Sequence, residues 1–309
     1  MSKALKIILT IVMVLLLGFF SFLSYQINKS VTNIISQEET LKNERKFLQT
    51  YDIYSDDFKK NYAYRKEIVT NDKDSYDFSI DTYELDGKRD IFIFIHGMGG
   101  TGETMIPHSQ IFLERGFSAV LYDQRNSGTH PVKKNNMGVG EKGDLINVVY
   151  YLKEKYPDRK INIFAESYGA HTFLHGYEQI KDKIQLVILD SPMANGEEFI
   201  DQGLKEASNQ TSIPFGLMKF LGNIGSKVIE GYGYKETNGL LTFDKIDNPI
   251  LIITNKEDSV TPFTHAQSIF DKSGERKVMM LSESGHTQMY FNDREKYIKG
   301  IEDFLGKYN

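Results

Sequence analysis

Residues 161–170 read INIFAESYGA, which predicts a short buried strand, a sharp turn that carries one serine, and the start of a helix. A serine at such a turn is pushed out above the sheet, and the backbone N–H groups that follow it point toward the same space. Gly169 has no side chain, so the turn can close tightly. Ser167 is therefore a candidate nucleophile, the alternative being a helix-starting serine in an unrelated α/β protein.

An acid and a histidine follow Ser167, each just past the end of a predicted strand. Residues 249–255 and 277–281 are apolar enough to be strands, and Asp258 and His286 lie in the loops after them. Open α/β sheets place their sites at these strand ends. A serine hydroxyl needs a base to take its proton, and the imidazole needs a carboxylate to fix its tautomer.

Two other carboxylates compete with Asp258 for the role of the acid. Glu257 is its neighbour in the sequence, and Asp190 ends the predicted strand 185–189. We favour Asp258 because of its place in the turn after the strand.

A glycine-rich loop precedes the serine in the sequence. The apolar strand 90–95 runs into residues 96–102, HGMGGTG. Such a loop can bring a backbone N–H toward the reaction centre of the serine and complete an oxyanion hole. A phosphate-binding loop is the alternative, but the Lys-Ser/Thr pair that such a loop requires is missing.

These stretches, together with residues 122–128 (YDQRNSG), resemble the α/β-hydrolases, in particular bacterial serine hydrolases of the lysophospholipase-like and S33 aminopeptidase-like kind. The resemblance covers most of residues 64–309. It implies Ser167 as nucleophile, His286 as general base and then acid, and Asp258 as the orienting acid. It also implies that Met98 and Tyr168 supply the oxyanion N–H groups. Ala165 and Asn126 stand where the family commonly has glycine.

Strands and helices alternate along the chain. Strands are predicted at 64–69, 76–85 and 118–122, and helices at 141–156, 168–180 and 293–305. Such alternation predicts an α/β-hydrolase fold with a mostly parallel sheet covered by helices on both faces. Residues 195–246 are too long for a plain connection and predict a small helical cap inserted before the acid-bearing strand. Its apolar residues favour an acyl substrate, although any small helical subdomain needs them for packing.

The N-terminus predicts a signal anchor. Lysines precede an apolar run over residues 7–23, which is near the lower length limit of about 17 residues for a membrane span. It is followed by no small-residue cleavage site. We expect residues 1–27 to form a transmembrane helix, 28–62 a stalk, and 63–309 the catalytic domain outside the membrane. A cleaved signal peptide, and hence a secreted protein, is the alternative.

Composition narrows the possible partners. The chain has 309 residues, a net charge of −5 and no basic patch, which argues against nucleic acid. It has no cysteine, so it forms no disulfide or thiolate metal site. We expect no metal and no organic cofactor. His171 and His175 lie one helical turn apart but lack further ligands nearby. Asp123 and Arg125 are expected to hold their loop by an ion pair.

The sequence thus predicts a serine hydrolase that cleaves a carboxylic ester of a lipid or small molecule through an acyl-enzyme. The preference for an ester over an amide rests on the family resemblance. A serine aminopeptidase or an acyltransferase would use the same triad. A catalytically silent membrane-tethered binding protein is a further alternative, because a fold alone does not prove activity.

Overall fold

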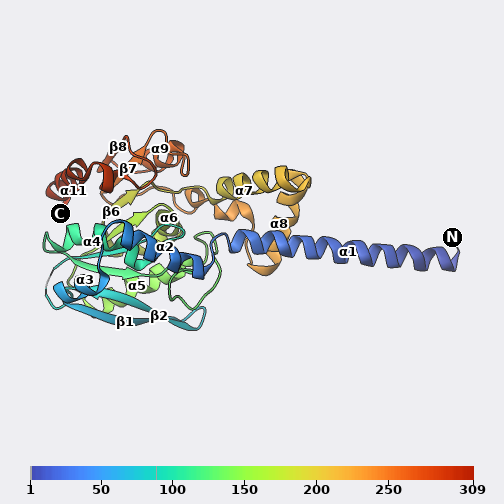
Figure 1. Ribbon diagram of the computed structural model, residues 1–309, viewed down its shortest axis with the longest axis horizontal. Coiled ribbons are helices and arrows are strands. Elements are labelled where there is room, and N and C mark those ends of the chain that lie inside the picture. The colour runs from blue at the N-terminus through green and yellow to red at the C-terminus, as the bar shows by residue number, and fades with distance from the viewer. Residues whose placement is uncertain (1, 88) are drawn as a thin grey trace. The chain divides into compact units, whose positions relative to one another are not determined.

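The computed structural model describes residues 2–87 and 89–309, which form two units (Figure 1). The helical unit contains the chain up to Ile34 together with Gly196–Asn238, and the sheet unit contains Ile35–Asn195 and Gly239–Asn309. The strands are β1 (Tyr64–Asn71), β2 (Tyr76–Tyr83), β3 (Ile91–Ile95), β4 (Ser118–Tyr122), β5 (Ile161–Glu166), β6 (Ile184–Asp190), β7 (Ile250–Asn255) and β8 (Lys277–Ser282).

The α-helices are α1 (Lys3–Thr32), α2 (Gln37–Thr50), α3 (Ser55–Asn61), α4 (Ile106–Leu113), α5 (Glu141–Lys155), α6 (Tyr168–Ile180), α7 (Gly196–Thr211), α8 (Phe215–Ile229), α9 (Phe263–Asp271), α10 (Met289–Asn292) and α11 (Arg294–Tyr308). Short 3₁₀ turns are η1 (Gly102–Met105), η2 (Lys181–Lys183), η3 (Tyr234–Thr237) and η4 (Gly239–Leu241). The predicted last helix, 293–305, begins one residue later and ends three residues later. Asp293 is its N-cap, because its side chain accepts a hydrogen bond from the Lys296 N–H.

All eight strands form one sheet in the order β1-β2-β4-β3-β5-β6-β7-β8. The pairs β1–β2 and β2–β4 are antiparallel and the remaining pairs are parallel. The predicted mostly parallel α/β-hydrolase sheet is therefore confirmed. Glu166 at the end of β5 pairs with Asp190 at the end of β6, so the carboxyl ends of the central strands lie in line. The loops that carry the predicted site residues all leave from this edge.

Apolar clusters cover both faces of the sheet because successive strand side chains point to opposite sides. Along β3, Ile93 belongs to one cluster and Phe92 to the other. Val148 of α5 and Leu174 of α6 pack in the cluster of Ile93, whereas Phe112 of α4 and Phe304 of α11 pack in that of Phe92. A strand buried on both faces has a continuous apolar sequence, which is why β3, β5 and β6 could be found from the sequence alone.

The predicted stalk, residues 28–62, is divided between the two units. Its first residues extend α1 to Thr32, and Val31 is buried in the helical unit. Helices α2 and α3 belong to the sheet unit, where Phe58 packs beside Tyr83. The side chain of Asn43 donates to the Gly99 carbonyl of the glycine-rich loop at 3.2 Å. These contacts fasten residues 37–61 to the sheet unit.

Helix α1 contains an 18-residue window with a mean hydropathy of 2.7, and it is long and apolar enough to cross a membrane. A signal sequence near an N-terminus has the same features. The large apolar side chains of α1 from Leu5 to Phe22 are exposed, and the buried residues of this helix begin at Ser24.

Candidate active site

The turn between β5 and α6 holds Ser167 in an unusual backbone conformation, with φ 50° and ψ −112°. A non-glycine residue with positive φ stores strain, which surrounding contacts must hold in place. The Ser167 N–H donates to the Asp190 carbonyl at 2.9 Å, and the Met193 N–H donates to the Ser167 carbonyl at 3.1 Å. A Cβ at Gly169 would lie 2.2 Å from the Ile95 carbonyl oxygen, so this glycine lets α6 start directly against β3.

The structure brings Ser167, His286 and Asp258 together in one hydrogen-bonded chain. His286 Nε2 lies 2.9 Å from Ser167 Oγ, and His286 Nδ1 lies 2.8 Å from Asp258 Oδ2. They come from loops after β5, β7 and β8, 119 and 28 residues apart in sequence. With Nδ1–H donating to Asp258, Nε2 is left to accept the serine proton, as general base catalysis requires.

Asp258 is oriented by its own loop. Its Oδ1 accepts from the N–H groups of Val260 and Thr261 at 2.8 Å each, and the Thr261 hydroxyl lies 3.1 Å from Oδ2. Burial opposes ionisation of Asp258, but the hydrogen bonds from His286 and from Thr261 outweigh it and hold its pKa below the usual range. Asp258 is therefore an anion that faces His286. Neither Thr261 nor its role was predicted from the sequence.

The two segments predicted to supply oxyanion donors both border Ser167. Tyr168 is the first residue of α6, so its N–H lies at the helix end rather than in the helical hydrogen-bond ladder. A Cβ at Gly97 would lie 3.3 Å from the Ser167 Cβ, so the loop that carries Met98 touches the turn. This arrangement suits two backbone donors beside one serine.

Two further carboxylates, Glu166 and Asp190, act on His286 through their charges. Asp190 is buried and accepts hydrogen bonds from Tyr297 at 2.8 Å and from Ser191 at 3.0 Å, so it holds the end of β6. Burial raises the pKa of Asp190 to about 6. Burial and then the charge of Asp190 raise the pKa of Glu166 to about 7. Asp190, the alternative candidate for the orienting acid, thus hydrogen-bonds to Tyr297 and Ser191, whereas Asp258 is the carboxylate that hydrogen-bonds to His286.

These charges set the pKa of His286. Burial would lower the pKa of His286, but the hydrogen bond and charge of Asp258, followed by the charges of Glu166 and Asp190, raise it above the usual range. A neutral imidazole is needed to accept the serine proton. Activity is therefore expected to be present above the pKa of His286 and to be lost as the pH falls through it.

We expect Glu166→Gln to move the acidic limb of the kcat/KM profile slightly to lower pH, because the fraction of Glu166 that is ionised near its pKa of about 7 raises the pKa of His286. The measurement is the pH dependence of ester hydrolysis from pH 5 to 9, with Glu178→Gln on α6 as the control that leaves the limb in place. An acidic limb that stays in place or moves to higher pH in Glu166→Gln would contradict this electrostatic coupling.

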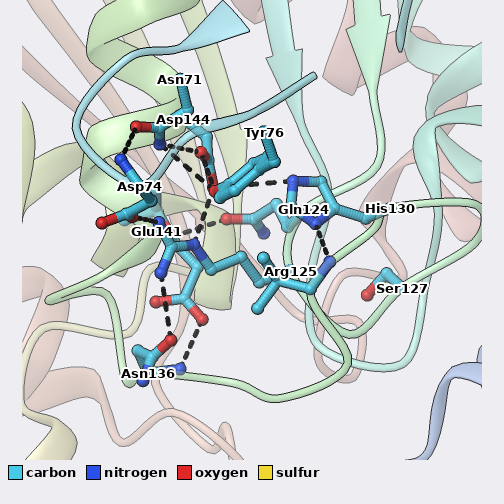
Figure 2. A network of polar contacts seen from close by, with 12 residues as sticks. Asn71, Asp74, Tyr76, Gln124, Arg125, Ser127, His130, Asn136, Glu141 and Asp144 are labelled. Carbon is cyan, nitrogen blue, oxygen red and sulfur yellow. Dashed lines mark hydrogen bonds and ion pairs between the residues drawn. The ribbon is translucent and has the colours of Figure 1, made fainter. Parts of the chain in front are cut away.

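The loop after β4 is held by a polar network rather than by the expected Asp123–Arg125 pair (Figure 2). The Arg125 Nε–H donates to Asp144 Oδ2 at 2.9 Å, and its guanidinium also contacts Asp74. Asp123 instead accepts from the N–H groups of Gly102 and Thr129. The predicted pair was wrong because Arg125 binds carboxylates from distant parts of the chain, whereas Asp123 accepts hydrogen bonds from backbone N–H groups.

The network continues to Tyr168, the residue that follows Ser167. Arg125 Nη1 donates to the Asn136 side chain at 3.2 Å, and the Asn136 N–H donates to Glu141 Oε1 at 2.6 Å. The Tyr168 hydroxyl donates to the same Glu141 oxygen at 2.9 Å. Burial raises the pKa of Glu141, so its charge depends on these donors. The side chain of Tyr168 is thereby fastened to the network that surrounds Arg125.

We expect Arg125→Met to lower the free energy of unfolding by about 3–5 kcal/mol, because it leaves the buried Asp144 carboxylate without its cation. Arg65→Met is the matched control. Its pair with Asp86 is more than half exposed, so the expected loss is about 1 kcal/mol or less. Urea unfolding of the full chain in detergent compares the two. Equal losses of the free energy of unfolding in the two variants would show that the buried Arg125–Asp144 pair stabilises the protein no more than an exposed pair does.

His171 and His175 are buried on α6 with their rings perpendicular, 4.7 Å apart. Within residues 2–87 and 89–309, no three His, Cys, Asp or Glu side chains gather as a metal site. The two rings pack edge to face.

A strand-end serine, a histidine and an aspartate at the carboxyl edge of a mixed sheet define the α/β-hydrolase class of fold. The family profile described as the alpha/beta hydrolase fold matches residues 90–215. The chain is 30% identical to the uncharacterized protein YqkD of Bacillus subtilis (strain 168) over 220 residues, 70% of this chain and 71% of that protein. The chain belongs to the α/β-hydrolase family.

Other proteins are similar to the chain at lower identity. The uncharacterized protein YfhR of Escherichia coli (strain K12) is 25% identical over 217 residues, 69% of each chain. The solved structure of the Pyrococcus furiosus esterase Pf2001 superimposes with a TM-score of 0.65 at 20% identity, covering 82% of this chain and 94% of that one.

Proposed function

We propose that this protein is a serine hydrolase that cleaves a carboxylic ester through an acyl-enzyme. The observation that carries the proposal is the unbroken chain from Ser167 Oγ to His286 at 2.9 Å and on to Asp258 at 2.8 Å. A serine hydroxyl becomes nucleophilic when such a base is in hydrogen-bond reach and is itself oriented by a third group. The strained turn presents that hydroxyl at the strand edge.

In the first step His286 Nε2 takes the proton as Ser167 Oγ attacks the carbonyl carbon of the ester. The backbone N–H groups of Met98 and Tyr168 stabilise the oxyanion, and His286 then gives its proton to the departing alcohol. Water enters, loses a proton to His286, and attacks the acyl-enzyme. Collapse of the second tetrahedral intermediate releases the acid and regenerates Ser167.

An ester is preferred over an amide because an alcohol leaves more readily and because the fold neighbour from Pyrococcus furiosus is described as an esterase. The substrate class we propose is an acyl ester of a lipid or small molecule. A serine aminopeptidase and an acyltransferase would use the same three residues, and a substrate panel separates them.

We further propose that α1 anchors the enzyme in the membrane as a single uncleaved span, with the catalytic domain outside. The apolar run of α1 is exposed over its length, and Lys3 and Lys6 precede it. Basic residues at the front favour retention of that end in the cytoplasm. A cleaved signal would leave a shorter, secreted chain, which the intact mass of the mature protein distinguishes.

The test is labelling of the full chain by a fluorophosphonate probe, with Ser167→Ala beside the wild type. We expect the wild type to be labelled, the variant to be silent, and p-nitrophenyl esters to compete with the probe. Release of amines from peptide anilides at a rate exceeding ester cleavage would favour the aminopeptidase. A folded wild type that no probe labels would favour the binding protein.

A further inference from the structure

Helix α8 carries two apolar faces, and one of them packs on α1. A Cβ at Gly222 would lie 2.6 Å from a methyl carbon of Ile27, and one at Gly225 would lie 2.7 Å from the Ser24 carbonyl oxygen. The Ser24 hydroxyl donates to the Leu221 carbonyl at 2.6 Å. The two helices therefore touch backbone to backbone, and Figure 1 shows α8 lying across α1. Both belong to the helical unit.

The second face of α8 is apolar and open. Its exposed members, called the α8 stripe, are Leu217, Phe220, Ile224, Val228 and Ile229. Phe220 is 61% exposed and Val228 is 80% exposed. Leu217, Phe220, Ile224 and Val228 are spaced by three and four residues, which is the helical period, so their side chains form one continuous strip with Ile229 next to its last member. An apolar strip of this kind marks an interaction surface in a natural protein.

The α8 stripe continues into the apolar surface of α1. A groove of about 460 Å³ lies between the two helices, lined on one side by the stripe and on the other by Leu17 and Phe20. No charged side chain lines it. Lys219 of α8 is held instead by Glu197 and Asp201 of α7. The groove thus opens toward the apolar run of α1, and the contacts with Ser24 and Ile27 lie just past the end of that run.

We infer that α8 is a second lipid-contacting element, which lies in the plane of the membrane with its stripe against the acyl chains. Its 15 residues are too few to span a bilayer, which takes about 20. A helix that crosses a spanning helix at the membrane surface lies in the interface, where an apolar face and a polar face are both satisfied. The inference rests on the anchoring role proposed for α1, because the groove meets α1 where hydrocarbon would surround it.

The chain contains no tryptophan, so single tryptophans report position without background. The full chain is reconstituted into phosphatidylcholine vesicles with and without brominated acyl chains, which quench tryptophan on contact. Three variants are compared. Phe220→Trp reports the α8 stripe, Phe19→Trp reports the span of α1, and Asn209→Trp is the control on the exposed face of α7.

We expect the emission of Phe220→Trp to shift to shorter wavelength and to lose about the same fraction to brominated lipid as that of Phe19→Trp. The emission of Asn209→Trp should lose almost none. Quenching of Phe19→Trp without quenching of Phe220→Trp would overturn the inference and leave the anchor in place. A blue-shifted but unquenched Phe220→Trp would mean that protein, such as a second copy of the chain, covers the stripe.

The same measurements test the lipid contact of α8 independently of the membrane anchor proposed for α1. Quenching of the Phe220→Trp variant without quenching of the Phe19→Trp variant would mean that α8 binds lipid by itself and that α1 does not span. If neither reporter is quenched, both the anchor and the lipid-contacting role of α8 are overturned. A Phe220→Ser, Val228→Ser variant should keep fluorophosphonate labelling, since the stripe carries none of the reacting groups.

Discussion

Replacement of Ser167 by alanine is expected to lower kcat for ester hydrolysis by about 10⁴–10⁶-fold. The variant loses the atom that forms the acyl bond, whereas the oxyanion donors and the binding surface remain. Residual turnover above the rate in water should therefore persist, with KM little changed. The measurement is steady-state hydrolysis of a p-nitrophenyl ester by the full chain.

Ser109→Ala is the matched control for this prediction. Ser109 is also buried, but its hydroxyl donates to the Ile106 carbonyl of its own helix at 2.9 Å. We expect turnover of this control to equal that of the wild type. If Ser167→Ala kept wild-type turnover on every acyl substrate that the wild type cleaves, another residue would be the nucleophile.

Replacement of Asp258 by asparagine is expected to lower kcat by about 10⁴-fold while the protein stays folded. The amide has nearly the shape of the carboxylate, but its NH₂ group can donate to Nδ1, and it carries no negative charge to stabilise the imidazolium. The histidine is then held in the wrong tautomer, with the proton on the nitrogen that faces Ser167. A single-turnover measurement of acyl-enzyme formation isolates this step.

Asp190→Asn tests the competing assignment of the acid. Asp190 accepts from Tyr297 and Ser191 and reaches His286 only through its charge. We expect a much smaller loss of kcat and an acidic limb at lower pH, because the pKa of His286 falls when that charge is removed. A loss for Asp190→Asn equal to that for Asp258→Asn would require the roles of the two residues to be revised.

The sequence predicted the three site residues better than it predicted the residues that contact and orient them. Ser167, Asp258 and His286 each lie within four residues of the end of a strand, so their places at one sheet edge could be predicted from local patterns. The partners of Arg125 could not be predicted, because Asp74 and Asp144 lie 51 and 19 residues away and no local signal links them. Thr261 was missed for the same reason, since its orienting bonds depend on how the loop after β7 folds back.

By itself, the amino-acid sequence determined the α/β-hydrolase fold, the order of the three site residues and an apolar N-terminal helix. These features could be predicted because buried strands and amphipathic or apolar helices have recognisable patterns within short stretches of sequence. The tertiary structure alone decided which carboxylate faces His286, how buried charges raise its pKa, and which face of α8 stays open. Those features depend on distances between residues far apart in the chain, and electrostatic and packing energies follow distance in space rather than position in sequence.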